Sequence, residues 1–187
     1  MEIYVIRHTK VADVEGVCYG QSEVNLAETF SEEVDFYQKR LASDFDAVFC
    51  SPLQRCQKLA KNLNLGNIQV DSRLMEMNFG DWENQKWDDI DQDKLNDWMQ
   101  DFVHTRTPNG ENLSDLFFRV KSFLDDLREK QDLKKVLLVT HAGVIRCTWA
   151  YLLEIPLQNI FKIPVEFGEI FVFRLGKEDI LDKIIMK

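Results

Sequence analysis

The sequence predicts an α/β fold with three layers, α/β/α, in which helices cover both faces of a largely parallel central sheet and a small helical insertion forms a cap. Short apolar runs alternate along the chain with longer stretches of helical periodicity, an order typical of such sheets. The run VLLVT at residues 136–140 shows no polar alternation, as expected for a strand buried on both faces. The 187 residues fit one domain, which we expect to span 1–187.

The predicted strands are short runs rich in β-branched and aromatic residues, which favour extended structure. Four of them are well defined: residues 2–7, 46–50, 136–140 and 170–175. Two further stretches, residues 68–70 and 181–186, are weaker candidates for strands.

The predicted helices lie between these runs, where apolar residues recur at spacings of three and four. The stretches with this pattern are residues 30–41, 53–63, 113–127 and 144–152. Thr29 and Glu32 form a capping-box pattern before the first helix. Ser51 and Pro52 are a candidate N-cap and first-turn proline for the second helix.

The stretch of about residues 75–108 differs from the rest in composition. It is rich in Asp, Asn and Gln and holds three of the four tryptophans, with one helix expected around residues 88–102. We interpret this stretch as an insertion that lies over one end of the sheet, where it would cover a site.

Composition and charge exclude several classes of protein. The net charge of −9 disfavours nucleic acid and anionic membranes as partners. No apolar run approaches the ~20 residues that span a bilayer, and the N-terminus MEIYVIRH has no signal-peptide pattern. The four cysteines lack metal-ligand spacing, so we expect them to be reduced core residues of a cytoplasmic protein. We expect a monomer or a homodimer.

Basic residues follow three of the predicted strands. Arg7 and His8 end the first strand, Arg55 follows the second, and His141 follows the third. Ligands of open α/β sheets bind at the carboxyl ends of strands, so these side chains predict an anion pocket, with His8 facing solvent. The helix N-termini at Ser51-Pro52 and Ala142-Gly143 would add free N–H groups there. A single histidine at a strand end is more often structural, and the agreement of three strand ends favours function.

Five segments in order resemble the motifs of the histidine phosphatase superfamily, which has the phosphoglycerate mutase-like fold. They are IRH at residues 6–8, SPLQRC at 51–56, LMEMNFGDWE at 74–83, PNGEN at 108–112 and VTHAGVIR at 139–146. Five matches in the right order are specific. The chain departs from the family at Thr9, where a glycine is usual, and at residues 10–13, which lack the usual Glu-Thr pair and asparagine. Thr9 can still supply a hydroxyl and a backbone N–H.

The resemblance implies a phosphoric monoester hydrolase that forms a phosphohistidine on His8. It implies that Arg7, Arg55, His141 and Thr9 bind the phosphoryl group, and that His141 also takes part in catalysis. Glu76 is the candidate general acid and later the base for water, and Glu83 is the second choice. The cationic side chains balance the phosphoryl charge, so no metal and no cofactor are expected.

The stretch CYGQSEVNL at residues 18–26 resembles the corresponding part of α-ribazole phosphatases. This implies hydrolysis of α-ribazole 5′-phosphate in the assembly of the cobalamin nucleotide loop. A phosphoglycerate mutase-like enzyme or a broad sugar-phosphate phosphatase is the alternative on the same fold. A regulatory module that binds phosphoproteins or phosphohistidine is the alternative from another class.

Several further residues are candidates for substrate contacts: Tyr19, Gln21, Trp82 and Glu83. The tryptophans of the cap either stack on an aromatic base of the substrate or hold the cap together. His104 and Arg106 either reach the site from the cap or lie on its surface. Glu111 orients an arginine, closes the pocket or stands at the start of a helix.

Overall fold

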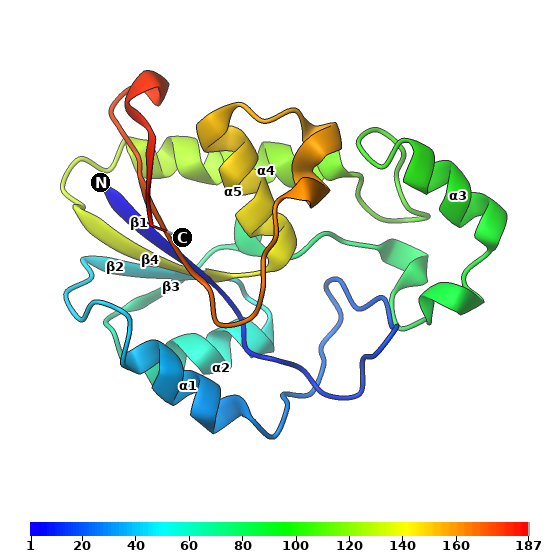
Figure 1. The fold of residues 1–187 in the computed structure, drawn as a ribbon, viewed down its shortest axis with the longest axis horizontal. Helices are drawn as coiled ribbons and strands as arrows, with labels where there is room; N and C mark the ends of the chain where they lie inside the picture. The colour runs from blue at the N-terminus through cyan, green and yellow to red at the C-terminus, as the bar shows by residue number, and fades with distance from the viewer. Residues whose placement is uncertain (187) are drawn as a thin grey trace.

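The computed structural model describes residues 1–186 and contains a six-stranded sheet in the order β3-β2-β4-β1-β5-β6 (Figure 1). The strands are β1 (Glu2–Arg7), β2 (Ala47–Cys50), β3 (Ile68–Val70), β4 (Lys135–Thr140), β5 (Ile170–Arg174) and β6 (Lys183–Met186). The first four run parallel to one another, whereas β5 is antiparallel to β1 and β6 is antiparallel to β5. The sheet is therefore largely parallel, as predicted.

Strand β4 lies in the middle of the parallel strands and is buried on both faces. Val136 and Leu138 belong to one core cluster, and Leu137 and Val139 belong to the other. All four side chains are fully buried, which explains why the strand needs no polar positions.

Helices cover both faces of the sheet. Helices α1 (Phe30–Gln38) and α2 (Gln54–Leu63) pack on one face, and α4 (Leu113–Arg128) and α5 (Ala142–Leu153) pack on the other (Figure 1). None of the helices among residues 1–186 combines the length and hydrophobicity that crossing a membrane requires.

Helix α1 begins at Phe30 as predicted, but neither of the two predicted side-chain caps forms. Thr29 has helical backbone angles, which do not suit a cap, and its hydroxyl donates to Glu33 instead of capping α1. Ser51 does not open α2, which begins at Gln54 with Leu53 as N-cap. The Ser51 hydroxyl accepts from the imidazole of His141 and from the backbone N–H of Leu53, which precedes the helix.

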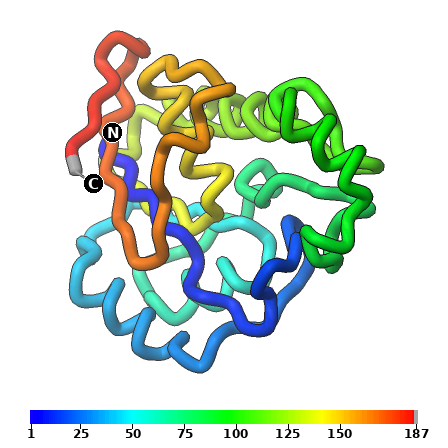
Figure 2. The backbone as a smooth tube through the Cα atoms, turned by 45° about the vertical axis from the view of Figure 1, so that its right-hand side comes forward, coloured from blue at the N-terminus to red at the C-terminus, as the bar shows by residue number. Residues whose placement is uncertain are grey.

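Residues 75–108 form a lobe at one end of the sheet, which we call the cap (Figure 2). Its one α-helix, α3 (Gln92–Gln100), is shorter than predicted, because Asp91 caps it by accepting from the backbone N–H groups of Asp93 and Lys94. The lobe packs around a small core of its own, made of Cys18, Trp82, Ile90 and Leu95. Cys18 comes from the loop after β1, and this loop pairs with the lobe through a bridge between Val17 and Lys86.

Candidate active site

Parallel pairing brings the predicted basic residues together at the carboxyl edge of the sheet. Arg7 is in register with Thr140, so His8 follows β1 at the level where His141 follows β4. The backbone N–H of His8 donates to the Thr140 carbonyl at 2.9 Å. The two imidazole rings lie 5.2 Å apart between centroids, which places both histidines in one site.

The His8 side chain does not face solvent, in contrast to the sequence prediction. It is only 2% exposed, because the loop between α5 and β5 lies over it and places Phe167 edge-on at 5.7 Å between ring centroids. Its Nδ1 donates to the Thr9 carbonyl at 2.7 Å, and this leaves Nε2 as the nitrogen with the free lone pair. Burial, and then the charges of Arg55 and Arg7, hold the pKa of His8 well below its usual value.

His141 is fully buried and bonded at both ring nitrogens. Nε of Arg55 donates to its Nδ1 at 3.4 Å, and its own Nε2 donates to the Ser51 hydroxyl at 2.8 Å. Burial, followed by the neighbouring His8 and Arg55, lowers the pKa of His141 well below the ordinary value. Both histidines are therefore neutral at neutral pH.

Arg55 links the two histidine strands to the loop after β1. It is fully buried, and its terminal nitrogens donate to the backbone carbonyls of Ser22 and Gly20. With the bond to His141, three of its five N–H groups are used. The same guanidinium lies 5.3 Å from the ring centroid of Tyr19, so the predicted substrate residue Tyr19 stands at the border of the anion pocket.

Arg7 is held by two residues, Val165 and Phe167, that no sequence pattern indicates. Its guanidinium stacks on Phe167 with 3.8 Å between Cζ and the ring centroid, and it donates to the Val165 carbonyl. Two buried polar atoms at this strand end, Nε of Arg7 itself and Oγ1 of Thr9, have no hydrogen-bond partner among residues 1–186. An unsatisfied buried donor costs about 1–3 kcal/mol, which an anion at this strand end would recover.

The two helix N-termini predicted to bind the anion are occupied by carboxylates of the chain itself. At the start of α5 the backbone N–H of Gly143 donates to Glu76 at 3.1 Å. At the start of α2 the N–H of Gln54 donates to Glu23. Carboxylates suit the positive end of a helix dipole, so these side chains leave anion binding to the arginines.

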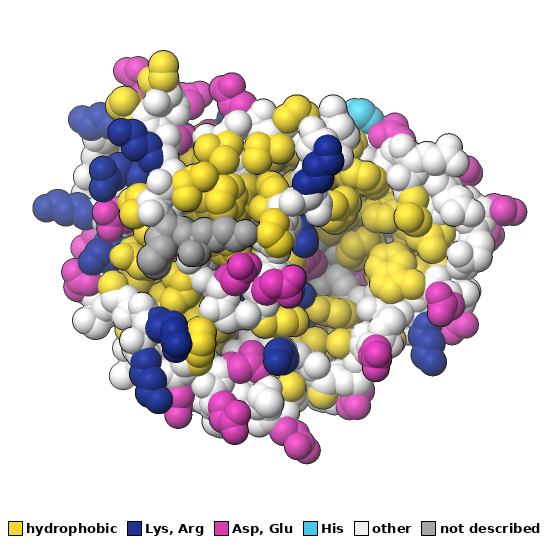
Figure 3. All heavy atoms as spheres, viewed as in Figure 1, with side chains coloured by type: hydrophobic (Ala, Val, Ile, Leu, Met, Phe, Trp, Pro, Cys, Tyr) yellow, Lys and Arg dark blue, Asp and Glu magenta, His cyan; other side chains and the backbone are white. Residues whose placement is uncertain are grey.

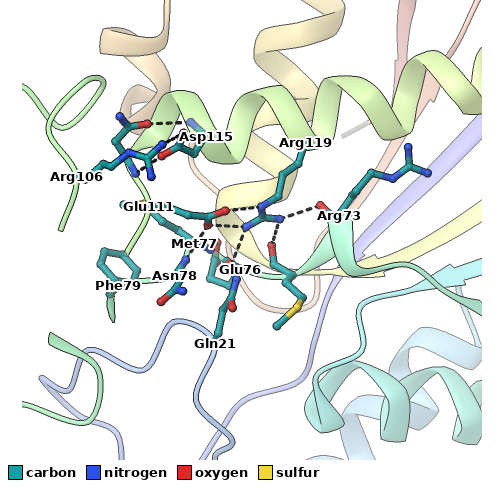
Figure 4. Close-up of polar contacts among 12 residues, drawn as sticks. Gln21, Arg73, Glu76, Met77, Asn78, Phe79, Arg106, Glu111, Asp115 and Arg119 are labelled. Atoms are coloured by element: carbon teal, nitrogen blue, oxygen red, sulfur yellow. Dashed lines mark hydrogen bonds and ion pairs between the residues drawn. The ribbon is translucent and has the colours of Figure 1, made fainter. Parts of the chain in front are cut away.

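Glu76 is held in place on several sides (Figure 4). Its carboxylate accepts from the N–H groups of Gly143 and of Met77, and its backbone carbonyl accepts from Gln21 and Arg119. A Cβ atom on Gly143 would lie only 2.2 Å from Oε1 of Glu76. Only glycine at this position therefore lets the carboxylate approach the helix so closely.

Arg119 of α4 uses all five of its N–H groups to organise the Glu76 segment (Figure 4). Two hydrogen bonds go to the Glu111 carboxylate, both at 2.9 Å. The other three go to backbone carbonyls of Arg73, Met75 and Glu76. Glu111 thus orients an arginine, which is one of its three predicted roles, and Arg119 is a site-positioning residue that the sequence reasoning missed.

Glu83 and Gln21 connect the loop after β1 to the cap. Glu83 accepts from the backbone N–H groups of Gln21 and Phe79 and from the Ser22 hydroxyl. Gln21 donates through its side chain to the Glu76 carbonyl at 2.9 Å. Both residues therefore hold the walls of the site together.

A cavity of about 210 Å³ opens beside Glu76, between the cap and the body of the protein. Its polar side chains include Glu76 and Arg146, and its aromatic walls are Tyr19, Phe79, Trp87 and Phe161. Figure 3 shows hydrophobic side chains gathered around this hollow. The cavity can take a leaving group that has an apolar, flat part.

The structure separates the remaining candidates. Trp82 is buried in the core of the cap and Trp98 packs edge-to-face against it, whereas Trp87 lines the cavity. His104 and Arg106 are exposed and pair with Asp101 and Asp115, so both lie on the surface. Within residues 1–186 no three His, Cys, Asp or Glu side chains gather as a metal site would require.

Comparison with known proteins places the chain in a family. The family model of the histidine phosphatase superfamily (branch 1) matches residues 3–181. Adenosylcobalamin/α-ribazole phosphatase of Escherichia coli K12 is 30% identical over 177 residues, covering 90% of this chain and 87% of that protein. Putative phosphoserine phosphatase 2 of Hydrogenobacter thermophilus is 28% identical, covering 88% and 84%.

The fold agrees with solved structures. A putative α-ribazole-5′-P phosphatase from Escherichia coli superposes with a TM-score of 0.89 and 25% identity, covering 99% of this chain and 94% of that one. This confirms the predicted phosphoglycerate mutase-like architecture. Because the match runs through all five motif segments and almost the whole fold, the chain belongs to the histidine phosphatase superfamily, branch 1, and the predicted phosphatase class is confirmed.

Proposed function

We propose that this protein is a metal-independent phosphomonoesterase that works through a phosphohistidine on His8. One observation carries the proposal. His8 is buried and neutral, its Nδ1–H is committed to the Thr9 carbonyl, and its Nε2 lone pair is free beside two arginines. A neutral imidazole with one free nitrogen in a cationic pocket is suited to attack a phosphate dianion.

In the first step Nε2 of His8 forms a bond to phosphorus while the bond from phosphorus to the leaving oxygen breaks. Arg7, Arg55 and Thr9 supply the free donors that bind the phosphoryl oxygens. The His141 Nε2–H exchanges the Ser51 hydroxyl for a phosphoryl oxygen, and this donor then stabilises the charge of the transition state. Arginine suits this role because its planar fork binds phosphate at two points.

Glu76, in its acid form, gives a proton to the leaving oxygen. Its position supports this role, because its carboxylate accepts from the N–H of Gly143, two residues after His141, and it lines the cavity. Its backbone is held by Arg119 and Gln21. In the second step the Glu76 carboxylate takes a proton from water, and the water oxygen attacks phosphorus. The phosphorus–nitrogen bond breaks, and inorganic phosphate and neutral His8 are restored.

For the substrate we propose a nucleoside-like phosphate, α-ribazole 5′-phosphate first. The aromatic walls formed by Phe79, Trp87 and Phe161 suit a flat base. Relatives from Escherichia coli and Salmonella typhimurium are named adenosylcobalamin/α-ribazole phosphatases. A small polar ester such as phosphoserine would leave these walls without a partner. The α-ribazole stretch at residues 18–26 lines the same cavity through Cys18, Tyr19 and Gly20.

The proposal includes a cytoplasmic enzyme that is a monomer or a homodimer. All four cysteines are buried and free, as suits a reducing compartment. Sedimentation at several protein concentrations would distinguish the two oligomeric states.

The experiment is a phosphate-release assay with a panel of esters. The panel contains α-ribazole 5′-phosphate, ribose 5-phosphate, phosphoserine, 3-phosphoglycerate and p-nitrophenyl phosphate. We expect the highest kcat/KM with α-ribazole 5′-phosphate and no transfer of phosphate within 3-phosphoglycerate. Preference for phosphoserine would assign the other substrate class named among the relatives. Failure to hydrolyse any ester, together with binding of phosphoproteins, would favour the regulatory module.

A further inference from the structure

Arg146 lines the cavity from the same face of α5 as Gly143, whose backbone N–H donates to Glu76. It follows Gly143 by three positions, so the two residues are neighbours on one side of the helix. Both line the cavity together with Glu76. Arg146 and the candidate proton donor Glu76 therefore border the same cavity.

The guanidinium of Arg146 is anchored at one end and free at the other. Its Nε donates to the Ile163 carbonyl at 3.0 Å. Its two terminal nitrogens, which carry four N–H groups, make no hydrogen bond or ion pair within residues 1–186. Arg119 on the neighbouring helix α4 has all five donors filled. The protein thus orients the Arg146 side chain through Nε and leaves its two terminal nitrogens free to bind a ligand.

The charges around Arg146 favour a neutral ligand over a second anion. Burial is the main cause that lowers the pKa of this half-buried guanidinium, and Arg7 acts in the same direction. Glu76 and Glu166 oppose them and favour the charged form. With two carboxylates already nearby, the free N–H groups are better matched to hydroxyl or ether oxygens than to another carboxylate.

The rest of the cavity next to Arg146 is apolar. The ring centroid of Phe161 lies 5.7 Å from Cζ of Arg146. Ile160, Leu113 and Leu116 complete this wall. A ligand that fits both features has oxygen acceptors close to its ester group and a flat apolar part further away.

We infer that Arg146 is a specificity-determining residue that binds the sugar oxygens of the leaving group while the aromatic walls take the base. This inference rests on the proposed phosphomonoesterase function, and it defines the substrate class as phosphate esters of a sugar that carries a heteroaromatic group. The contact is made to the leaving group and not to the phosphoryl oxygens, so it acts mainly on KM.

The test compares Arg146→Met and Arg146→Lys with the wild type on four esters. These are α-ribazole 5′-phosphate, ribose 5-phosphate, phosphoserine and ethyl phosphate, which has neither sugar nor base. For Arg146→Met we expect kcat/KM with the two sugar esters to fall about 10- to 100-fold further than with ethyl phosphate, as for one or two charge-assisted hydrogen bonds. Arg146→Lys should lose less, because it keeps the charge but not the fork.

Arg106→Met is the matched control, because the Arg106 side chain is 64% exposed on the outside of the cap. The Tm and the inhibition constant of inorganic phosphate report folding and the phosphate pocket. Equal losses with all four esters, together with weaker inhibition by phosphate, would overturn the inference and place Arg146 in the phosphate pocket. A loss confined to phosphoserine would also overturn it, because the ligand would be a carboxylate.

Failure of the proposed substrate has a different signature. If the wild type does not prefer α-ribazole 5′-phosphate over ethyl phosphate, the proposed substrate is wrong. A selective loss with ribose 5-phosphate in Arg146→Met would still support the contact to sugar oxygens. If Arg146→Lys folds but Arg146→Met does not, the Lys variant alone decides, and an unchanged ratio between ribose 5-phosphate and ethyl phosphate would overturn the inference.

Discussion

The phosphate side and the leaving-group side of the site are built from different kinds of structure. On the phosphate side His8 and His141 directly follow buried strands, Arg55 lies in the first turn of α2, and all three are at most 2% exposed. On the leaving-group side, Glu76 and Arg146 border a cavity whose walls come from the loop after β1, the cap, α4, α5 and the segment after α5. The rigid sheet edge suits chemistry that all phosphate esters share, and the assembled cavity suits discrimination among leaving groups.

The comparison predicts that changes on the phosphate side affect every ester alike. His8→Gln should abolish turnover of both ethyl phosphate and p-nitrophenyl phosphate, because no other free imidazole nitrogen is available in the site. Thermal shift with inorganic phosphate should persist, since Arg7 and Arg55 remain. Residual turnover at a comparable rate with either ester would show that His8 is not the nucleophile.

Replacement of the proton donor should distinguish the esters. Glu76→Gln should slow hydrolysis of ethyl phosphate by roughly 10²–10⁴-fold, the usual contribution of a general acid. The first step with p-nitrophenyl phosphate should suffer less, because its leaving group is stable as an anion. Equal slowing of both esters without accumulated phosphoenzyme would assign Glu76 a binding or structural role, and Glu83 would be tested next.

Replacing Arg119, which holds the Glu76 segment, should slow the same esters as Glu76→Gln but by less. Arg119→Met should slow ethyl phosphate hydrolysis on the order of 10²-fold, as expected for a misplaced catalytic group, and p-nitrophenyl phosphate less. In the Glu76→Gln background the added effect on rate should largely disappear. Arg106→Met, on the exposed side of the cap, is the control. Equal effects of Arg119→Met with and without Glu76 would show that the clamp acts on something other than the acid.

The smallest expected effect concerns stability and pH. His8 and His141 have pKa values lowered by burial, so below about pH 6.5 the unfolded chain binds protons that the folded protein excludes. Each histidine should therefore cost up to about 1.4 kcal/mol of unfolding free energy per pH unit as the pH falls below 6.5. Urea unfolding of the wild type and of His8→Gln measures the difference in unfolding free energy, which should change with pH below about 6.5 and become constant above pH 7. A pH-independent difference would mean that His8 titrates normally in the fold.

The two sides also differ in how far the sequence predicts them. The phosphate side was predictable, because Arg7, His8 and His141 directly follow apolar runs and parallel strands bring their ends together. Its finer contacts were not. The stacking of Phe167 on Arg7 depends on how a loop 160 residues away folds back, and the burial of His8 follows from that loop.

On the leaving-group side the sequence indicated Glu76 and a cap, but not what holds them. Arg119 lies inside an amphipathic helix pattern, where an arginine is expected on the surface. Its five hydrogen bonds go to Glu111 and to the backbone of residues 73–76, which lie more than 40 residues away in the sequence. The occupation of both helix N-termini by Glu76 and Glu23 also depends on tertiary contacts. Arg146 ends the motif segment VTHAGVIR, and its spacing of three from Gly143 on one helix face is a local signal that could have identified it.

The most direct test is to trap the covalent intermediate. Wild type and Glu76→Gln are mixed with p-nitrophenyl phosphate, quenched in base and digested, and the peptides are read by mass spectrometry. The account predicts acid-labile, base-stable phosphate on His8, at a higher level in Glu76→Gln because the carboxylate that activates water is missing. Turnover by both proteins with His8 unmodified, or phosphate found on Ser51 or His141 instead, would contradict it.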